Sequence, residues 1–207
     1  EAVVLPRRYA VTEGTLTVEL EPSLAVATLK AIEALRRVEC ECTEMTATRL
    51  SANVAGLRAL EALGNPDDPR IEALRTEANL GIQRLLAQQK VDGGWGWYSS
   101  LRSDTMVTSW VMIALSEASE ILTVDRQVFP RASTFLLENL VTRTRSDQDY
   151  LLNRSAIMVY ALAKASNTGI TSQISNLYDL RDRLSVYAKA LLAASILELR
   201  REDPERL

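Results

Sequence analysis

The sequence predicts an all-α protein of the α/α toroid class, in which helical hairpins form an inner ring and an outer ring. Two observations lead to this class. Apolar residues recur at spacings of three and four along almost the whole chain, and similar alanine-rich segments return along it. The chain has 207 residues, of which 47% are hydrophobic, so it is long enough to bury a substantial core.

Residues 1–22 differ from the rest of the chain. Within them, residues 15–20 alternate polar with apolar side chains, which is typical of a short β-strand. The pattern changes at Ser23, an N-capping residue that follows a proline and precedes a helix that we expect to reach Arg37. We therefore expect two parts, a connector from a preceding β domain in residues 1–22 and the toroid in residues 23–207.

Seven further helices fit into the remaining residues. Gly64-Asn65-Pro66 closes one of them, Asp92-Gly93-Gly94 closes the next, and most of the others begin at Ser, Thr or Asp. The expected ranges are 44–63, 70–86, 104–119, 126–144, 147–166, 172–182 and 185–201.

Four of these helices contain a similar alanine-rich motif. The motif occurs at Arg58–Ala62, Ile113–Ala118 and Tyr160–Ala165, and more loosely at Ala190–Ala193. The first three copies are spaced by roughly 50 residues, which suits a repeated helical hairpin. Small alanine side chains let neighbouring helices approach closely, which favours an inner ring of these helices wrapped by an outer ring. We favour a true repeat. The alternative is a chance likeness between amphipathic helices.

Composition argues against several classes of function. The 24 Lys and Arg residues are interspersed with 27 Asp and Glu residues, for a net charge of −3, so we expect no nucleic-acid partner. The longest apolar runs fall short of the roughly 20 residues that a bilayer span needs, so we expect no direct membrane insertion. The chain has no histidine, which removes the usual general base, nucleophile activator and metal ligand. We therefore expect no enzymatic activity, no metal and no cofactor.

The two cysteines, Cys40 and Cys42, are separated only by Glu41 and are too few for a disulfide framework. Cys42 stands at the expected start of a helix, where the helix dipole would stabilise a thiolate and make the side chain more reactive. The alternative is a small buried apolar residue, which the absence of histidine favours. A further alternative is a redox or soft-metal pair of both cysteines, although two ligands leave the coordination of a metal incomplete.

Cys42-Thr43-Glu44-Met45 resembles the Cys-x-Glu-Gln signature of the thioester-containing domain of bacterial α2-macroglobulins and their complement relatives. In that family the cysteine and the glutamine condense into an internal thioester, which acylates an attacking protease. The resemblance places Cys42, Glu44 and Met45 at the positions of the thioester motif. Met45 stands where the family has glutamine, and a thioether has no acyl carbon. We therefore expect no internal thioester in this chain.

A second segment carries the same resemblance. Residues 92–98 read Asp-Gly-Gly-Trp-Gly-Trp-Tyr, and the same bacterial domains have a similar loop at a similar distance after the cysteine. In the family this loop lies close to the thioester and helps to shield it from water. We therefore expect Trp95 and Trp97 to lie near Cys42. The residues assigned to the shielding loop are Gly93, Gly94, Trp95, Trp97 and Tyr98.

The resemblance covers nearly the whole chain and implies a function. We expect a structural and interaction domain of a macroglobulin-like, protease-trapping inhibitor, of which this chain is a piece. The family's domain is longer, so we expect the last helical hairpins to be missing at the C-terminal end. The implied partners are the other domains of the parent chain and the target proteases. The implied location is extracytoplasmic, whether periplasmic, at the cell surface or secreted.

The alternative function is a terpene-cyclase-like α/α toroid that binds an apolar ligand. Gln88 or Gln89 followed by Gly93-Gly94-Trp95 resembles the Gln-Trp repeat of triterpene cyclases, which share the ring shape. Such enzymes need an acidic aspartate cluster and an aromatic-lined cavity. The sequence has one such element, no clustered aspartates for this acid and two phenylalanines, so we favour the macroglobulin-like function.

Overall fold

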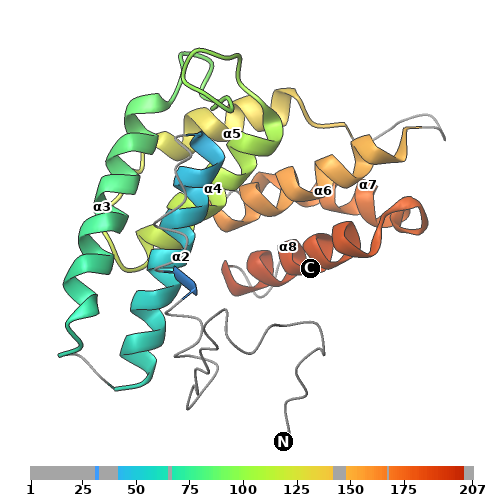
Figure 1. Ribbon diagram of the computed structural model, residues 1–207. Coiled ribbons are helices and arrows are strands. Elements are labelled where there is room, and N and C mark those ends of the chain that lie inside the picture. Colours follow the sequence, from blue (N-terminus) through green and yellow to red (C-terminus); the bar gives the residue numbers. More distant parts are fainter. Residues whose placement is uncertain (1–30, 33–41, 65–66, 142–147, 167, 203–207) are drawn as a thin grey trace, which may run out of the picture.

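The computed structural model describes residues 31–32, 42–64, 67–141, 148–166 and 168–202, and every regular element within these residues is helical (Figure 1). The α-helices are α2 (Thr43–Ala62), α3 (Arg70–Gln88), α4 (Thr105–Ser119), α5 (Val128–Glu138), α6 (Asp149–Lys164), α7 (Thr171–Asp179) and α8 (Val186–Glu202). Two short 3₁₀ helices, η1 (Thr168–Ile170) and η2 (Arg181–Arg183), flank α7. The predicted all-α class is confirmed.

The helices form two layers, as the toroid prediction requires. In the inner layer α2 packs against α4, α4 against α6, and α6 against α8. In the outer layer α3 covers α2, α5 covers α4, and α7 covers α6 and α8 (Figure 1). The four alanine-rich motifs lie on α2, α4, α6 and α8, so the repeated sequence marks the inner helices. Within the described residues α2 and α8 do not pack against each other as neighbours, so these helices form an open arc.

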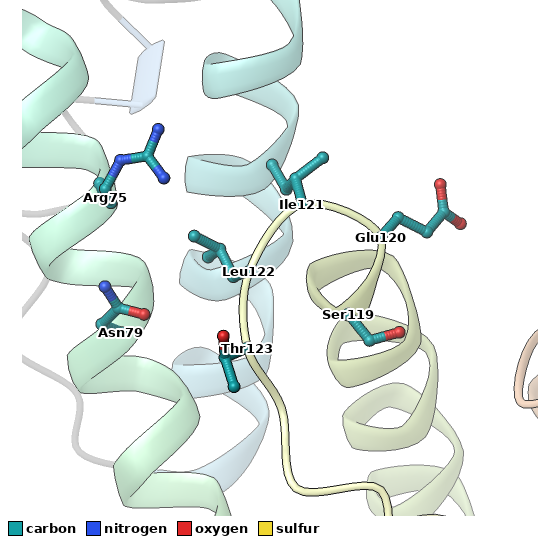
Figure 2. Close-up of a pocket in the computed structure, with 7 residues that line it drawn as sticks. All are labelled: Arg75, Asn79, Ser119, Glu120, Ile121, Leu122 and Thr123. Carbon is teal, nitrogen blue, oxygen red and sulfur yellow. The ribbon is translucent and has the colours of Figure 1, made fainter.

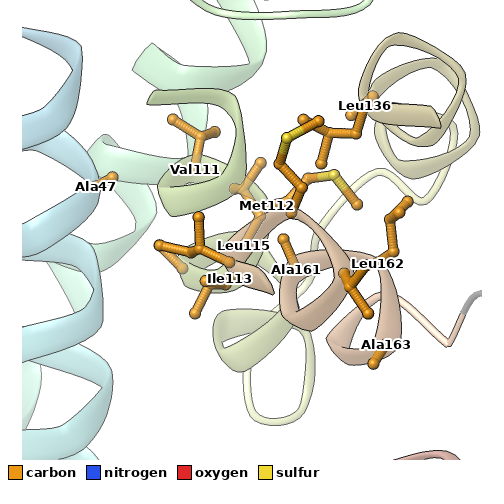
Figure 3. Packing of buried hydrophobic residues seen from close by; sticks show 14 of the residues in the cluster. Ala47, Val111, Met112, Ile113, Leu115, Leu136, Ala161, Leu162 and Ala163 are labelled. Carbon is orange, nitrogen blue, oxygen red and sulfur yellow. The ribbon is translucent and has the colours of Figure 1, made fainter. Parts of the chain in front are cut away.

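The core lies between the inner helices. Val111 and Leu115 of α4 are fully buried in its middle (Figure 3). Ala47 of α2 lies on one side of them, and Ala161 and Leu162 of α6 lie on the other. The small alanine side chains allow the helices to pack closely, while the branched side chains fill the space between them. Because α4 has neighbours on both sides, apolar residues occupy most of its surface instead of one stripe.

The N-termini of the inner helices all lie on the same face of the arc. On that face, Arg154 Nε of α6 donates a hydrogen bond to the hydroxyl of Thr105, the first residue of α4 (2.7 Å). On the opposite face, Arg58 Nη2, late in α2, donates to the carbonyl oxygen of Glu117, late in α4 (2.8 Å). Neighbouring inner helices are therefore parallel. Cys42, immediately before α2, lies at the end where these helices start.

Most predicted helix ranges agree with the structure to within two residues, and the range 126–144 is the clearest exception. That helix ends at Glu138, where the Asn139 side chain donates to the carbonyl oxygen of Phe135 (2.8 Å). Val141 continues the apolar pattern, but its backbone pairs with the hydroxyl of Ser155 on α6. A tertiary contact replaces the helical hydrogen bonds that the pattern predicted.

The predicted connector in residues 1–22 and most of the predicted helix 23–37 lie outside the described residues. Ile32 is described, is helical and is buried against Leu57, Leu60 and Leu74. No helix in the described part of the chain is long and apolar enough to cross a membrane.

Candidate functional site

The candidate site lies at the start of α2. Cys42 is the N-cap residue of this helix, has an extended backbone (φ −74°, ψ 154°) and is 6% exposed. Its carbonyl oxygen accepts hydrogen bonds from the backbone N–H of Thr46 (3.1 Å) and from the Thr46 hydroxyl (3.2 Å). Its side chain accepts no capping hydrogen bond from the first turn and forms no disulfide within the described part of the chain. Cys42 is therefore a buried thiol at a helix N-terminus.

The aromatic loop reaches this helix start through its backbone. The N–H of Thr43 donates a hydrogen bond to the carbonyl oxygen of Trp97 (2.9 Å). Thr43 is itself buried, and its hydroxyl donates weakly to Oε1 of Gln88, the last residue of α3 (3.4 Å). The loop therefore takes one of the first backbone N–H groups of α2, which have no partner inside the helix. The backbone of Trp97 therefore lies next to the residue that follows Cys42. The closeness of the Trp95 and Trp97 side chains to Cys42, and their shielding role, stay predictions.

The other two motif residues lie on the first turn of α2. Glu44 and Met45 are both partly exposed. The Glu44 carboxylate accepts a hydrogen bond from the hydroxyl of Thr48, one turn further along the helix (3.1 Å). Successive side chains on an α-helix are rotated by about 100°, so Glu44 and Met45 point in different directions.

Trp95 anchors the loop to the core. Its side chain is fully buried, and its indole N–H donates to the carbonyl oxygen of Leu85 on α3 (2.7 Å). The Trp95 backbone pairs with α4, because its N–H donates to the Thr108 hydroxyl (2.9 Å) and its carbonyl accepts from Asp104 N–H (2.8 Å). Trp95 thus joins α3 to α4. A residue packed in this way is not the cavity-lining aromatic that a terpene-cyclase-like function requires.

Trp97 and Tyr98 behave differently from Trp95. Trp97 is 45% exposed and Tyr98 is 52% exposed, although both have large apolar rings. The loop therefore holds one aromatic side chain in the core and presents two at the surface beside the start of α2.

Glycines allow the tight course of the loop. Gly93 has a φ of 86°, and a Cβ atom there would lie 2.2 Å from the carbonyl oxygen of Arg131 on α5. At Gly96 a Cβ atom would lie 2.3 Å from the carbonyl oxygen of Arg102. Any side chain at either position would overlap with backbone. The loop is thus sterically fixed between α3, α5 and the segment before α4.

Polar side chains complete the loop. Asp92 Oδ1 accepts hydrogen bonds from Gly94 N–H (3.0 Å) and from the Ser103 hydroxyl (2.8 Å), which closes the two ends of the loop on each other. Gln89 Nε2 donates to the carbonyl oxygens of Gly93 and Val128. Sequence reasoning missed these roles. The signal for Asp92 was present, because an aspartate two residues before a glycine is a common turn former.

Sequence reasoning also missed Gln88 as a neighbour of the motif. Its carboxamide lies 45 residues from Thr43 in the sequence, and only the packing of α3 against α2 brings the two together. No sequence signal marks this pairing. Within the described residues no group of three or more Cys, Asp and Glu side chains is placed to hold a metal ion. Cys40, the other member of the redox or metal pair that was considered as an alternative, lies outside those residues.

Comparisons with known proteins agree with this geometry. The family model described as "A-macroglobulin TED domain" matches residues 16–145. Alpha-2-macroglobulin of Escherichia coli (strain K12) is 33% identical over 113 residues, which are 52% of this chain and 6% of that protein. The chain therefore corresponds to only a small part of this relative's length.

Solved structures of bacterial alpha-2-macroglobulins share the fold. The native Escherichia coli protein, from domain MG7 to the C-terminus, superposes with a TM-score of 0.64 at 23% identity, over 83% of this chain and 28% of that chain. The native conformation of the same protein gives 0.65 at 22% identity, over 83% and 11%. The Salmonella protein reacted with methylamine gives 0.66 at 21% identity, over 86% and 12%. Each match is a segment within a longer chain.

Proposed function

Because the chain belongs to the family of A-macroglobulin TED domains, we propose that it works as an interaction domain inside a longer, macroglobulin-like protein that traps proteases. In this proposal the domain is not an enzyme and carries no internal thioester. It moves as one rigid helical body when the parent protein closes around a protease. The parent protein works outside the cytoplasm.

The absence of the thioester is argued from Met45, which the resemblance to the Cys-x-Glu-Gln signature places at the position of the acyl donor. Thioester formation needs a carboxamide or carboxylate carbon close to the Cys42 sulfur, and a thioether has none. Glu44, the adjacent carboxylate, points in another direction and holds the Thr48 hydroxyl (3.1 Å). The chain also has no histidine to activate the thiol in another way.

Trapping does not require the covalent bond. A protease that cleaves a bait segment elsewhere in the parent is held by the shape of the closed protein. The surface aromatics Trp97 and Tyr98 suit contact with another domain of the parent chain, because contact would remove them from water. The domain then contributes shape and contacts, whereas in relatives it also supplies the acylating group.

Intact-mass analysis tests the proposal directly. A thioester between cysteine and glutamine releases one ammonia, and methylamine then opens it and adds its own mass. We expect the denatured chain to show neither the loss of ammonia nor the adduct. Iodoacetamide should label both cysteines under denaturing conditions without methylamine, and a Cys42→Ser variant should take up one label fewer.

Loss of ammonia from the unmodified chain would contradict the proposal. Gln88 lies next to Thr43 and is the carboxamide to examine in that case. A Gln88→Leu variant that regained the full mass would identify it as the acyl donor. A methylamine adduct on Glu44 or Met45 would contradict the proposal in the same way.

The converse experiment restores the family residue. In a Met45→Gln variant, a site that still has the family's geometry should lose ammonia in part of the molecules and become sensitive to methylamine at Cys42. We expect partial recovery at best, because a thioester that water can reach hydrolyses. A Thr48→Gln variant, with the carboxamide one turn away on an exposed position, is the matched control and should show no change.

A further inference from the structure

The groove between α3 and the turn after α4 has no part in the proposed function. It has a volume of about 410 Å³ and lies between Arg75 and Asn79 of α3 on one side and residues 119–123 on the other (Figure 2). Ligand pockets in proteins have volumes of roughly 300–1,000 Å³. The groove is therefore large enough to hold a small molecule or the end of a peptide.

Three polar side chains border this groove from both sides. Arg75 and Asn79 are one helical turn apart on the same face of α3, and both extend toward the turn that carries Thr123 (Figure 2). All three side chains are exposed, and none of them makes a hydrogen bond or an ion pair within the part of the chain that the structure describes. A guanidinium, a carboxamide and a hydroxyl group are therefore available to a ligand.

The groove has a positive charge that its own acidic residue does not cancel. Glu120 also borders the groove, but its carboxylate points away from Arg75 (Figure 2). It accepts a hydrogen bond from Arg58 on α2 (2.8 Å) and lies 3.5 Å from the ammonium group of Lys164 on α6, which pairs in turn with Glu198 on α8 (3.2 Å). Glu120 is thus held on the side of the inner helices. The free guanidinium of Arg75 favours an anionic ligand.

The turn after α4 adds apolar surface to the groove. Ile121 and Leu122 border it, and both are only partly buried against the core. Their backbone N–H groups donate to the carbonyl oxygen of Ala118 (3.1 and 2.8 Å), which fixes the turn. Ser119 uses its hydroxyl proton for the carbonyl oxygen of Ser116 (2.8 Å). The ligand should therefore combine an anionic group with an apolar group.

We propose that this groove binds the C-terminal residue of a peptide that ends in an apolar side chain. An arginine binds a carboxylate through two parallel hydrogen bonds, so Arg75 suits the terminal carboxylate. A carboxamide both donates and accepts, so Asn79 suits the last peptide bond. Leu122 offers an apolar contact to the last side chain. This binding goes beyond the proposed function and does not depend on it.

A peptide terminus fits this arrangement better than an internal acidic residue does. In a C-terminal residue the carboxylate and the last amide nitrogen are attached to the same α-carbon, and Arg75 and Asn79 are likewise neighbours on one helix face. An internal Asp or Glu places one or two rotatable methylene groups between its carboxylate and the backbone. These groups must be ordered on binding, which lowers the affinity.

A pair of acetylated peptides tests the proposal on the 207-residue chain. Acetyl-Ala-Ala-Ala-Leu has a free terminal carboxylate, whereas its C-terminal amide has the same sequence without the charge. We expect the acid to bind saturably and at least about tenfold more tightly than the amide, because a hydrogen bond to a charged group contributes at least that factor. NMR titration of the isotope-labelled chain measures both dissociation constants, and the shift changes should concentrate around Asn79 and Leu122.

Variants of the groove test the role of Arg75. In an Arg75→Gln chain the acid and the amide should bind equally, because the variant removes the charge. Arg75→Lys keeps the charge without the planar pair of donors, so it should retain only part of the preference for the acid. Arg84→Gln, which removes another exposed arginine of α3, is the matched control and should keep the full preference.

Four results would overturn the proposal. The first two are the absence of saturable binding of the acid and equal binding of the acid and the amide by the parent chain. The third is an Arg75→Gln chain that still prefers the acid. The fourth is equally tight binding of acetyl-Ala-Glu-Leu-amide, because any carboxylate would then suffice. The comparison of the acid with the amide needs no substitution, so it decides the question even if a variant does not fold.

Discussion

Gly93 illustrates how much of the loop geometry depends on single residues. Its φ of 86° lies in the region that side chains disfavour, and the carbonyl oxygen of Arg131 occupies the space that a Cβ atom would need. Gly64, after α2, has a similar φ of 66°, but no atom lies within 4 Å of its ideal Cβ position. Substitutions at these two glycines therefore distinguish the free-energy cost of a positive φ from the cost of steric overlap with neighbouring atoms.

We predict that Gly93→Ala lowers the free energy of unfolding by at least about 2 kcal/mol more than Gly64→Ala does. The conformational cost of a positive φ is about 1–2 kcal/mol in both variants, while only Gly93→Ala also displaces the α5 backbone. Urea denaturation of the two variants and the parent chain measures the difference. Equal losses would show that the loop moves away from α5 without cost.

Ser166 is a residue other than glycine that has a positive φ. It follows α6 with a φ of 57°, and its N–H donates to the carbonyl oxygen of Ala163 (3.0 Å). Glycine is the usual residue in this position after a helix. Ser166→Gly should therefore raise the free energy of unfolding by about 0.5–1 kcal/mol. Thermal and urea denaturation check the sign, and a destabilised variant would indicate that the serine side chain makes a contact of greater value.

At the scale of elements, the sequence predicts most helices but not what joins them. The inner helices α2, α4 and α6 could be recognised because each carries the alanine-rich motif and a buried core requires that periodicity. The end of α5 could not be predicted, because Val141 leaves the helix for a partner on α6, Ser155. The contact of Gln88 with Thr43 depends in the same way on packing between helices.

The aromatic loop was predicted as a unit, although its three aromatic residues differ in role. Trp95 and Trp97 look equivalent in the sequence, and only the structure shows that one ring is buried and the other is 45% exposed. The burial of Trp95 depends on a carbonyl oxygen of α3 that accepts its indole N–H. A sequence pattern contains no information about which ring meets such an acceptor.

We predict that Trp95→Phe lowers the free energy of unfolding by about 2 kcal/mol or more, because it removes ring volume and leaves the Leu85 carbonyl oxygen buried without this donor. Trp97→Phe, at a surface position two residues away, should change it by less than about 0.5 kcal/mol. Denaturation of both variants tests the loop as the joint between α3 and α4. Similar losses in the two variants would contradict the different roles of the two rings.

At the scale of the whole molecule, the described helices share one charge cluster across the inner layer. Burial raises the pKa of Tyr160, and the neighbouring carboxylates raise the pKa of Lys164 despite its burial. A group that holds its proton more tightly in the folded state stabilises that state below its ordinary pKa, and this stabilisation is lost as the pH rises through the folded value. The loss of a proton from either group at alkaline pH therefore lowers the free energy of unfolding.

We predict that the free energy of unfolding stays nearly constant from about pH 7 to about pH 9 and declines above about pH 10, where both groups begin to ionise in the unfolded chain. A Tyr160→Phe, Lys164→Met double variant should show a shallower decline. Urea titrations at a series of alkaline pH values measure both curves. If the free energy of unfolding declined equally in the two chains, groups other than Tyr160 and Lys164 would cause the loss of stability at alkaline pH.

The open arc also has a consequence for how the chain folds. Each helix in it packs mainly against helices that are one or two places away along the chain, so most contacts form without closing long loops. Such an arrangement has a low contact order and behaves as a one-dimensional array of coupled units. Helical hairpins can then form in any order and add to one another. Helix α4 packs against helices on both sides, whereas α2 and α8 lie at the two ends of the described inner layer, so unfolding of the described helices should begin at these ends and proceed inward toward α4.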